Sequence, residues 1–347
     1  MLADEVDFVI GVDTHRDFHT VAALQAGSGG LVAQAVLRAS AGGYVEALDF
    51  AAKYAPGPRA WAIEGTGSYG AGLARLLAQR GERVLEVGRP KREGRSRAKS
   101  DAIDALQAGR TLLGRSKLAQ PRAGGRREAL RALVRTRQGA LTAKRAGLCQ
   151  LRALVVCLPE PLRGELRGLT RARLLGRCAR LRPERSRDVE VRGSLLALRS
   201  VARRVQALSE EERALAREIE TLVRKLAPTL LAEPGVGPIT AAQLLVSWSH
   251  KGRFRSEAAF ARLAASAPIE ASSGEVVRHR LDPSGDRQLN RALHTIVVAR
   301  RKTHADTIAY VQRRRSEGKS VREAIRCLKR YVARHLFRLL EASATMA

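Results

Sequence analysis

The stretch Phe8-Val9-Ile10-Gly11-Val12-Asp13-Thr14-His15 decides how the first part of the chain folds. Mostly apolar residues, several of them β-branched, lead to the carboxylate of Asp13, and polar residues that suit a turn follow. This pattern is typical of a buried central strand that brings an acid to the edge of a sheet. Because an aspartate after a strand commonly does no more than start a turn, the role of Asp13 depends on partners elsewhere in the chain.

The residues that follow continue in an α/β pattern. Two further apolar segments, joined by a glycine-rich turn, predict a hairpin arrangement with the first strand. Helical periodicity and short strands then alternate, which is the order of an α/β domain. The further predicted strands cover 19–24, 31–37, 59–64 and 83–87, and the predicted helices cover 42–54 and 69–80.

Three further carboxylates are candidate partners of Asp13. Glu64 also ends a predicted strand, while Asp101 and Asp104 are three residues apart and share one face of a predicted helix. Each acid alone is explained by a turn or by the preference of acids for the first turn of a helix. Together they suit a pair of Mg²⁺ ions, which need several carboxylates from different elements. In an RNase H-like nuclease core the acids come, in this sequence order, from two strands and then from a helix.

The middle of the chain, from about 126 to 226, is predicted to be helical almost throughout. Apolar residues repeat there at alternating three- and four-residue steps, interrupted only by Glu212, and the pattern stops at Pro228. Such a heptad seam packs either inside the chain as a helical hairpin or between two subunits, and we favour pairing between subunits. The seam consists of Leu198, Val201, Val205, Leu208, Leu215, Ile219, Leu222 and Leu226.

A glycine- and proline-rich turn begins the last part of the chain. The sequence Pro234-Gly235-Val236-Gly237-Pro238-Ile239-Thr240 has the composition of a helix-hairpin-helix turn. In such a turn the two glycines let backbone N–H groups and a helix N-terminus approach a phosphate. An ordinary connection between two helices has the same composition, and seven residues do not separate these two interpretations.

A second loop contains the candidate nucleophile. Ser272 and Ser273 precede Gly274 in a loop that leads to Arg278 and Arg280. A serine hydroxyl is a poor nucleophile until a base or a metal takes its proton and cations steady the developing charge. The sequence around these serines has no histidine and aspartate at the spacing of a hydrolase triad. A Ser-Ser-Gly sequence by itself predicts only a loop.

Charge is distributed unevenly along the chain. Its 63 Lys and Arg against 34 Asp and Glu give a formal net charge of +29. Residues 1–64 carry four basic and eight acidic side chains, whereas residues 89–147 carry seventeen and four. Codon bias would spread arginine evenly, so the segregation favours a polyanionic partner, of which nucleic acid is the commonest. The predicted nucleic-acid contacts are Lys91, Arg92, Arg95, Arg97, Lys99, Gly235, Gly237, Arg278 and Arg280.

Composition excludes several other classes. Aromatic residues make up only 4%, which argues against a single-strand binder built on base stacking. The four cysteines show no C-x-x-C spacing, so neither a zinc site nor a disulfide scaffold is indicated. Without an apolar leader or a run of 18 apolar residues, we expect no signal peptide, no membrane partner, and a cytoplasmic location in a bacterium.

Several of these motifs occur in the order found in one family. They resemble the DEDD-type insertion-sequence transposases of the IS-110 group, some of which are called bridge-RNA recombinases. The resemblance covers almost the whole chain. Its motifs are Ile10-Gly11-Val12-Asp13-Thr14-His15, Glu64-Gly65-Thr66-Gly67, Lys99-Ser100-Asp101-Ala102-Ile103-Asp104-Ala105, Pro234-Gly235-Val236-Gly237-Pro238, Ser272-Ser273-Gly274, the segment from Arg280 to Gly285, and Glu317-Gly318-Lys319-Ser320.

The resemblance implies three regions and a set of site residues. These are an α/β RNase H-like (RuvC-like) domain over 1–120, a helical coiled-coil region over 121–230, and a mostly α C-terminal transposase domain over 231–347. Ser273 matches the serine that serves as nucleophile in the family, with Ser272 as the alternative. The implied ligands of Mg²⁺, expected as two ions, are Asp13, Glu64, Asp101 and Asp104.

The resemblance also implies an activity and partners. It predicts a DNA transposase or recombinase that cleaves and exchanges strands at element ends and target through a serine–DNA intermediate. A structured non-coding RNA is the expected guide. A homodimer or homotetramer is expected, with the acids and the serine contributed by different subunits.

Three alternatives stay open at the level of sequence. A junction-resolving endonuclease would use the same four acids to activate water and leave the serine idle. A non-catalytic nucleic-acid-binding protein would need none of them. An actin-like sugar or acetate kinase also begins with Gly-x-Asp-Thr, but it would need further glycine-rich phosphate loops and leaves the positive charge unexplained.

Overall fold

Strand β1 (Phe8–Thr14) lies at the centre of a five-stranded sheet in the computed structural model. The strand order is β3-β2-β1-β4-β5, with β2 (Phe18–Gln25) and β3 (Leu31–Arg38) added antiparallel on one side. On the other side β4 (Arg59–Glu64) and β5 (Arg83–Val87) run parallel to β1. All five strands predicted from the sequence are confirmed, and so is the mixed α/β character of this region.

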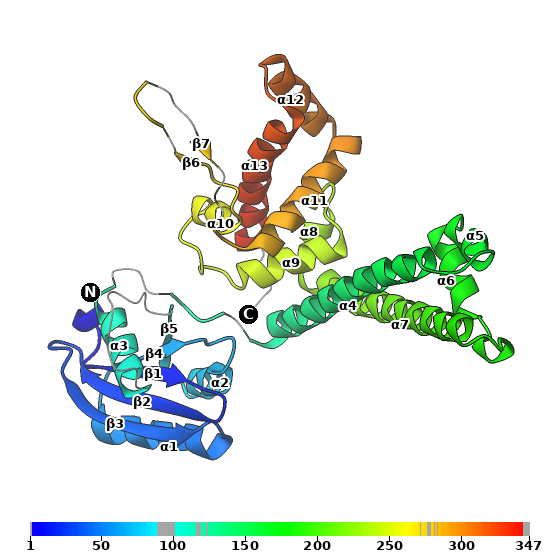
Figure 1. Cartoon of the computed structure of the whole chain (residues 1–347). Helices are drawn as coiled ribbons and strands as arrows, with labels where there is room; N and C mark the ends of the chain where they lie inside the picture. The colour runs from blue at the N-terminus through cyan, green and yellow to red at the C-terminus, as the bar shows by residue number, and fades with distance from the viewer. Residues whose placement is uncertain are drawn as a thin grey trace. The chain divides into compact units, whose positions relative to one another are not determined.

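The structure describes most, but not all, of the chain. The described residues are 2–88, 101–115, 119–122, 124–270, 272–275, 279–280, 282 and 284–342. They divide into two compact units, Met1–Gly124 and Gly125–Ala347, which are described separately below (Figure 1). The first unit contains the sheet and the second is mostly helical, as the sequence predicts.

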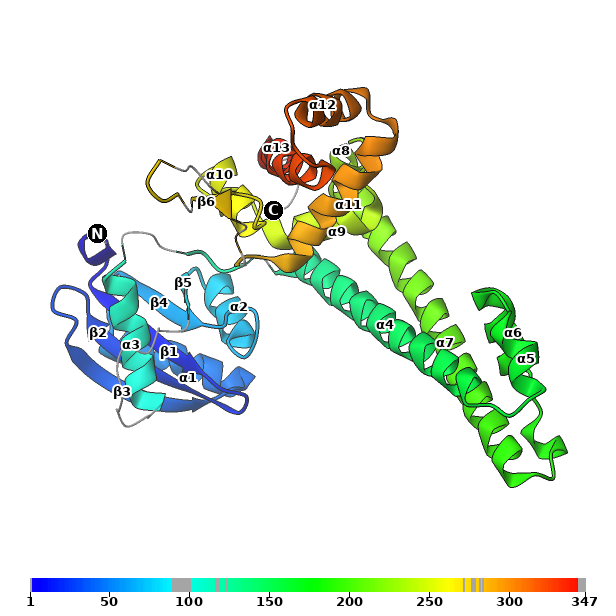
Figure 2. The same cartoon turned by 45° about the horizontal axis from the view of Figure 1, so that its top comes forward.

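Helices cover both faces of the sheet (Figure 2). On one face α1 (Ala41–Tyr54) and α2 (Ala71–Gln79) bury the apolar residues Ile10, Val12, Trp61 and Ile63. On the other face α3 (Asp101–Leu113) packs on Val9, Ala60 and Ala62. Because side chains alternate along a strand, odd-numbered residues of β1 and even-numbered residues of β4 point toward α3.

A glycine lets α3 lie directly on the central strand. A Cβ atom on Gly11 would lie 2.0 Å from the carbonyl oxygen of Ala105 and 2.7 Å from the backbone nitrogen of Gly109. Both neighbours are backbone atoms of α3, which cannot move aside as a flexible side chain can. The backbones of β1 and α3 are therefore in contact at a point where only glycine fits.

Two long helices form the first part of the second unit. Helices α4 (Gly125–Val156) and α7 (Val189–Leu226) run side by side, with α5 (Leu162–Arg167) and α6 (Arg171–Ala179) at one end (Figures 1 and 2). Short 3₁₀ turns cover Leu2–Asp4 in the first unit and Pro183–Arg185 here. The helical character expected over 126–226 is confirmed.

The heptad seam of α7 packs within the chain, so the expectation that it pairs between subunits is wrong. At one end Leu198, Val201 and Val205 are buried with Leu151 and Val155 of α4. At the other end Ile219, Val223 and Leu226 share a core with Leu130 of α4. A heptad pattern predicts an apolar partner helix but not the subunit that supplies it, which is why the sequence did not decide between the two.

Glu212, which interrupts the seam, is paired with cations of α4. Its carboxylate accepts a hydrogen bond of 2.7 Å from Arg137 and a second from Lys144. The Glu212 side chain is only 15% exposed, so the pair lies between the two helices and not on their outer surface. The hydrogen bond from Lys144 holds the pKa of Glu212 below its usual range, against the opposing effect of burial.

The remaining helices form one core with the base of α4 and α7. That core contains the aromatic rings of Trp248, Phe260 and Phe337. The segment Gly318-Lys319-Ser320 separates the last two helices, since one ends at Ser316 and the next begins at Val321. The elements are α8 (Pro228–Leu231), α9 (Pro238–Trp248), α10 (Glu257–Leu263), β6 (Ile269–Glu270), β7 (His279–Arg280), α11 (Arg287–Thr303), α12 (Ala305–Ser316) and α13 (Val321–Ala342).

A helix that crosses a bilayer has to be both long and predominantly apolar. Among the residues that the structure describes, no helix combines the length and the apolar character that a membrane span needs.

Candidate functional site

Asp13 and Glu64 lie at the same end of neighbouring parallel strands. Val12 of β1 pairs with Ile63 of β4, so the two acids follow at equivalent positions. By the alternation of side chains, both belong to the sheet face that α3 covers. Thr14 fastens the two strand ends together, because its Oγ1 donates a hydrogen bond of 2.9 Å to the Glu64 carbonyl oxygen.

Helix α3 brings its first turn to this edge of the sheet. Ala105, Ala108 and Leu112 are buried against the strands, and they mark the face of the helix that meets the sheet. Asp101 lies one turn before Ala105 on that face, and Asp104 is in the same first turn. The contact at Gly11 therefore sets the position of these two acids relative to Asp13.

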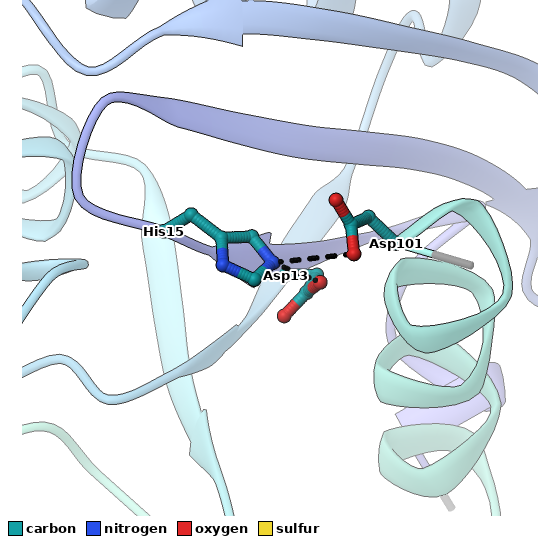
Figure 3. A group of neighbouring side chains, drawn as sticks. All are labelled: Asp13, His15 and Asp101. Atoms are coloured by element: carbon teal, nitrogen blue, oxygen red, sulfur yellow. Dashed lines mark hydrogen bonds and ion pairs between the residues drawn. The ribbon is translucent and has the colours of Figure 1, made fainter. Parts of the chain in front are cut away.

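One ring nitrogen of His15 lies close to both Asp13 and Asp101 (Figure 3). Its Nε2 atom is 3.0 Å from Asp13 Oδ2 and 3.4 Å from Asp101 Oδ1. One ligand atom from each of Asp13, His15 and Asp101 lies within 4.8 Å of the others. The Asp13 side chain is 12% exposed, whereas His15 and Asp101 are about half exposed, so this group is reached from solvent.

The group of Asp13, His15 and Asp101 is suited to a divalent cation. Carboxylate oxygens are the ligands that Mg²⁺ prefers, and two carboxylates from different elements converge here. An imidazole nitrogen suits transition metals such as Zn²⁺ better than Mg²⁺. Glu64 and Asp104 belong to the same edge of the unit but not to this closest group.

His15 was not among the site residues expected from the sequence. The available signal was its position two residues after Asp13, at the end of the strand. The tight turn between β1 and β2, in which the His15 N–H donates 3.0 Å to the Phe18 carbonyl oxygen, holds His15 beside the acids.

The serine segment belongs to the second unit. Ser272, Ser273 and Gly274 are exposed and lie between β6 and β7, which pair antiparallel with Ile269 opposite Arg280. Gly274 has a φ of 57°, a left-handed conformation that favours glycine. Arg280 is exposed on β7. The predicted contacts Lys91, Arg92, Arg95, Arg97, Lys99 and Arg278 lie outside the described residues.

The turn with Gly235 and Gly237 packs against other residues of the second unit. Gly235 has a φ of 74°, and a Cβ there would lie 2.7 Å from the Ile296 carbonyl oxygen. Arg300 Nε donates 2.7 Å to the Pro234 carbonyl oxygen, while the Gly237 N–H donates 3.0 Å to Thr240 Oγ1. Packing against α11 therefore accounts for the glycine at 235, and a phosphate contact at this turn stays a prediction.

Comparison with known proteins places these features in a family. A family model for DEDD transposases of IS110 type, described as "Transposase", matches residues 10–158, which include Asp13, Glu64, Asp101 and Asp104. A second model, "Transposase IS116/IS110/IS902 family", matches residues 227–312, which include Ser273.

A curated protein is similar to part of the chain. The "Insertion element IS110 uncharacterized 43.6 kDa protein" of Streptomyces coelicolor is 35% identical over 144 residues. The match covers 41% of this chain and 36% of that protein, so it spans about a third of the relative's length. Two models of one transposase group match in order along the chain, together with this relative, and the chain belongs to the IS110 family of transposases.

Proposed function

We propose that this protein is the DNA transposase, or recombinase, of an insertion sequence. The observation that carries the proposal is the meeting of Asp13 and Asp101 at the edge of the sheet, from a strand and a helix almost 90 residues apart. Delivery of acids from β1, β4 and α3 supports a RuvC-like, RNase H-like catalytic domain. Family membership supports DNA as the substrate.

The acids would hold divalent cations, which we propose to be two Mg²⁺ ions. Asp13 and Asp101 supply converging oxygen donors, and Glu64 and Asp104 would complete the ligand set from the adjacent strand and the same helical turn. Bound cations of this kind lower the pKa of an attacking hydroxyl and stabilise charge on the scissile phosphate. His15 Nε2, 3.0 Å from Asp13 and 3.4 Å from Asp101, would help to hold the two carboxylates close together.

Ser273 is the proposed nucleophile. Its hydroxyl loses a proton as Oγ attacks the scissile phosphorus; the new O–P bond replaces the bond to one deoxyribose oxygen, which leaves as a hydroxyl. Attack by a deoxyribose hydroxyl on the serine–phosphate bond reverses these changes and joins a new strand. Arg278 and Arg280, close to Ser273 in sequence, would steady the phosphorane charge.

The partners follow from charge and family. The formal charge of +29 supports contact with nucleic-acid backbones. We propose element ends and target DNA as substrates, a structured non-coding RNA as guide, and a homodimer or homotetramer as the active form. A guide RNA would place sequence recognition in base pairing, so the protein itself need not read base edges.

A covalent-adduct assay tests the proposal. Purified protein is incubated with element DNA, flanking RNA and Mg²⁺, and the denatured reaction is examined for protein attached to labelled DNA. Wild type should form the adduct, Ser273→Ala should form none, and Ser272→Ala serves as the matched control that retains it. An adduct of undiminished yield with Ser273→Ala would contradict the assignment of the nucleophile.

Product ends and one acid variant separate the other functions. Cleavage with a free 5′-phosphate and no adduct would indicate a nuclease that uses water. A non-catalytic binder predicts that Asp13→Asn changes nothing, whereas the proposed transposase loses cleavage and strand transfer in this variant while retaining DNA binding.

A further inference from the structure

The segment that carries Ser273 leaves and re-enters the helical unit at neighbouring points. It starts after Leu263, the last residue of α10, and ends before Asp286, the residue that precedes α11. The Asp286 N–H donates a hydrogen bond of 2.7 Å to the Leu263 carbonyl oxygen. Gly285 has a φ of 95°, and a Cβ there would lie 2.4 Å from the same oxygen. We call residues 264–285 the serine loop, and Leu263 and Asp286 close its base.

The first turn of the serine loop has an unfavourable backbone conformation. Ala265 has a φ of 48°, in the left-handed region that residues with a Cβ seldom adopt. Such a conformation persists only where the surrounding structure imposes it, and it is commonest at functional sites. A restraint on Ala265 therefore has to come from neighbouring groups.

Asn290 of α11 supplies that restraint. Its Nδ2 donates hydrogen bonds of 2.6 Å to the Ala264 carbonyl oxygen and 3.2 Å to that of Ala265. Its Oδ1 accepts a hydrogen bond of 2.9 Å from Lys329 Nζ on α13. A side-chain amide is needed here because it donates and accepts at once, which aspartate and alanine cannot do. The partner of Asn290 is itself half-buried, and burial lowers the pKa of Lys329.

We propose that Asn290 is a positioning residue that clamps the base of the serine loop and so directs Ser273. The inference rests on the proposed function for the role of Ser273. The clamp itself stands on the contacts at Ala264, Ala265 and Lys329. Asn290 is not proposed to contact DNA or a metal ion.

Hydrogen exchange on the full-length protein tests the clamp without using the reaction. In Asn290→Ala the backbone amides of residues 264–267, 269 and 270 should exchange about tenfold faster, the effect expected from losing roughly one hydrogen bond. Amides in the middle of α9 and α11 should be unchanged. Thr295→Ala is the matched control, because Thr295 is exposed on the same helix and its hydroxyl donates to the Arg291 carbonyl oxygen within that helix.

The conservative variant Asn290→Asp separates the clamp from folding. It keeps the size of the side chain and the oxygen that faces Lys329, but it loses the donor to Ala264 and Ala265. It should show the same faster exchange at the base of the loop. Ala265→Gly removes the strain, so Asn290→Ala should have a smaller effect on exchange in that background.

The adduct assay then links the clamp to Ser273. At saturating DNA, Asn290→Asp should form the adduct about tenfold more slowly with DNA affinity within about twofold of wild type. Unchanged exchange at 264–270 in both Asn290 variants would overturn the clamp. Faster exchange with an unchanged adduct rate would overturn its role in directing Ser273. Absence of any adduct in wild type would contradict the proposed function and the role of Asn290 in directing Ser273, while the exchange result still decides the clamp.

Discussion

Gly11 determines the distance between the central strand and the helix that carries two of the four acids. Backbone atoms of α3 occupy the space where any side chain at this position would begin. The glycine of the Ile10-Gly11-Val12-Asp13 sequence therefore has a packing role that composition does not reveal. Asp13 is two residues further along the same strand, so a change at Gly11 reaches the candidate metal site directly.

Substitution of Gly11 by alanine should damage both stability and the site. The new Cβ would lie 2.0 Å from the Ala105 carbonyl oxygen, and the backbone of β1 or α3 would have to shift. We expect a loss of about 3 kcal/mol in the free energy of unfolding, measured by denaturant titration.

The control for this prediction is Gly27→Ala. A Cβ at Gly27 meets nothing within 4 Å, so we expect a change of less than about 0.5 kcal/mol. Equal effects of the two substitutions would show that contact with α3 is not what requires glycine at position 11.

The sequence predicts part of the candidate site at this scale. Asp13 and Asp101 were expected to converge, and their carboxylates lie in one group. The place of His15 in that group depends on the conformation of the turn after β1, which a strand pattern does not encode. The clamp by Asn290 depends on contacts between α10, α11 and α13, and these have no local signature.

At the scale of elements, the seam of α7 contacts apolar residues at both ends and charged residues in between. Its ends are buried in two separate apolar clusters, while Glu212 pairs with Arg137 and Lys144 between them. A charged residue at one seam position can fix the register of paired helices, at a cost in stability. We infer that Glu212 fixes the register of α4 against α7.

Removal of the Glu212 carboxylate should destabilise the second unit. Glu212→Ala leaves two cations close together, and we expect a loss of about 2 kcal/mol at pH 7, less than for a fully buried pair. The combined variant Glu212→Leu, Arg137→Met and Lys144→Leu should recover most of this loss, because an apolar replacement of a whole ion pair is often neutral or stabilising. Denaturant titration measures both.

The effect of Glu212 should depend on pH in one direction. The pKa of Glu212 is lower in the folded protein than its usual value. The stabilisation that the Glu212 carboxylate provides is therefore fully present at any pH above the usual pKa of glutamate. It is lost as pH falls through the lowered pKa and the carboxylate is protonated. A difference between wild type and Glu212→Ala that grows on acidification would contradict this account.

The elements themselves were largely predictable. Apolar runs and turn residues located all five strands of the sheet, because these signals are local in the sequence. The partner of the α7 seam was not predictable in the same way, since periodicity describes one surface of a helix and not the element that covers it.

At the scale of the whole molecule, charge is the property that most concerns function. The sequence combines an acidic stretch over 1–64 with a strongly basic stretch over 89–147. The resemblance predicts three regions along the chain, and one apolar core of the second unit joins Leu130 of α4 with Leu226 of α7 and Leu340 of α13. Contacts over such distances in sequence leave no periodic signal.

Binding to duplex DNA should depend steeply on salt. If six or more phosphates are contacted, affinity should fall about a thousandfold between roughly 50 and 200 mM salt. Replacing Lys91, Arg92 and Arg95 by glutamine should reduce the slope of log affinity against log salt by about three, because each neutralised phosphate accounts for about one in that slope. Fluorescence anisotropy with labelled duplex measures this slope.

The matched control replaces three arginines that already have acidic partners. Arg163, Arg224 and Arg313 pair with Glu160, Glu220 and Glu317. Their replacement by glutamine removes the same formal charge but leaves the proposed phosphate contacts in place. The same reduction in slope for both triple variants would indicate a general effect of net charge.

The contact between Gly11 and α3 also constrains how this chain can evolve. No side chain can be added at position 11 unless the helix moves, whereas a Cβ at Gly109 would meet mainly the end of the Leu24 side chain, at 2.7 Å. A single substitution at Gly11 is therefore costly, whereas one at Gly109 requires only that the Leu24 side chain shift. A side chain at position 11 would have to be accompanied by a compensating shift of α3 near Ala105, so sequence change at this point of the strand is coupled to change in the helix.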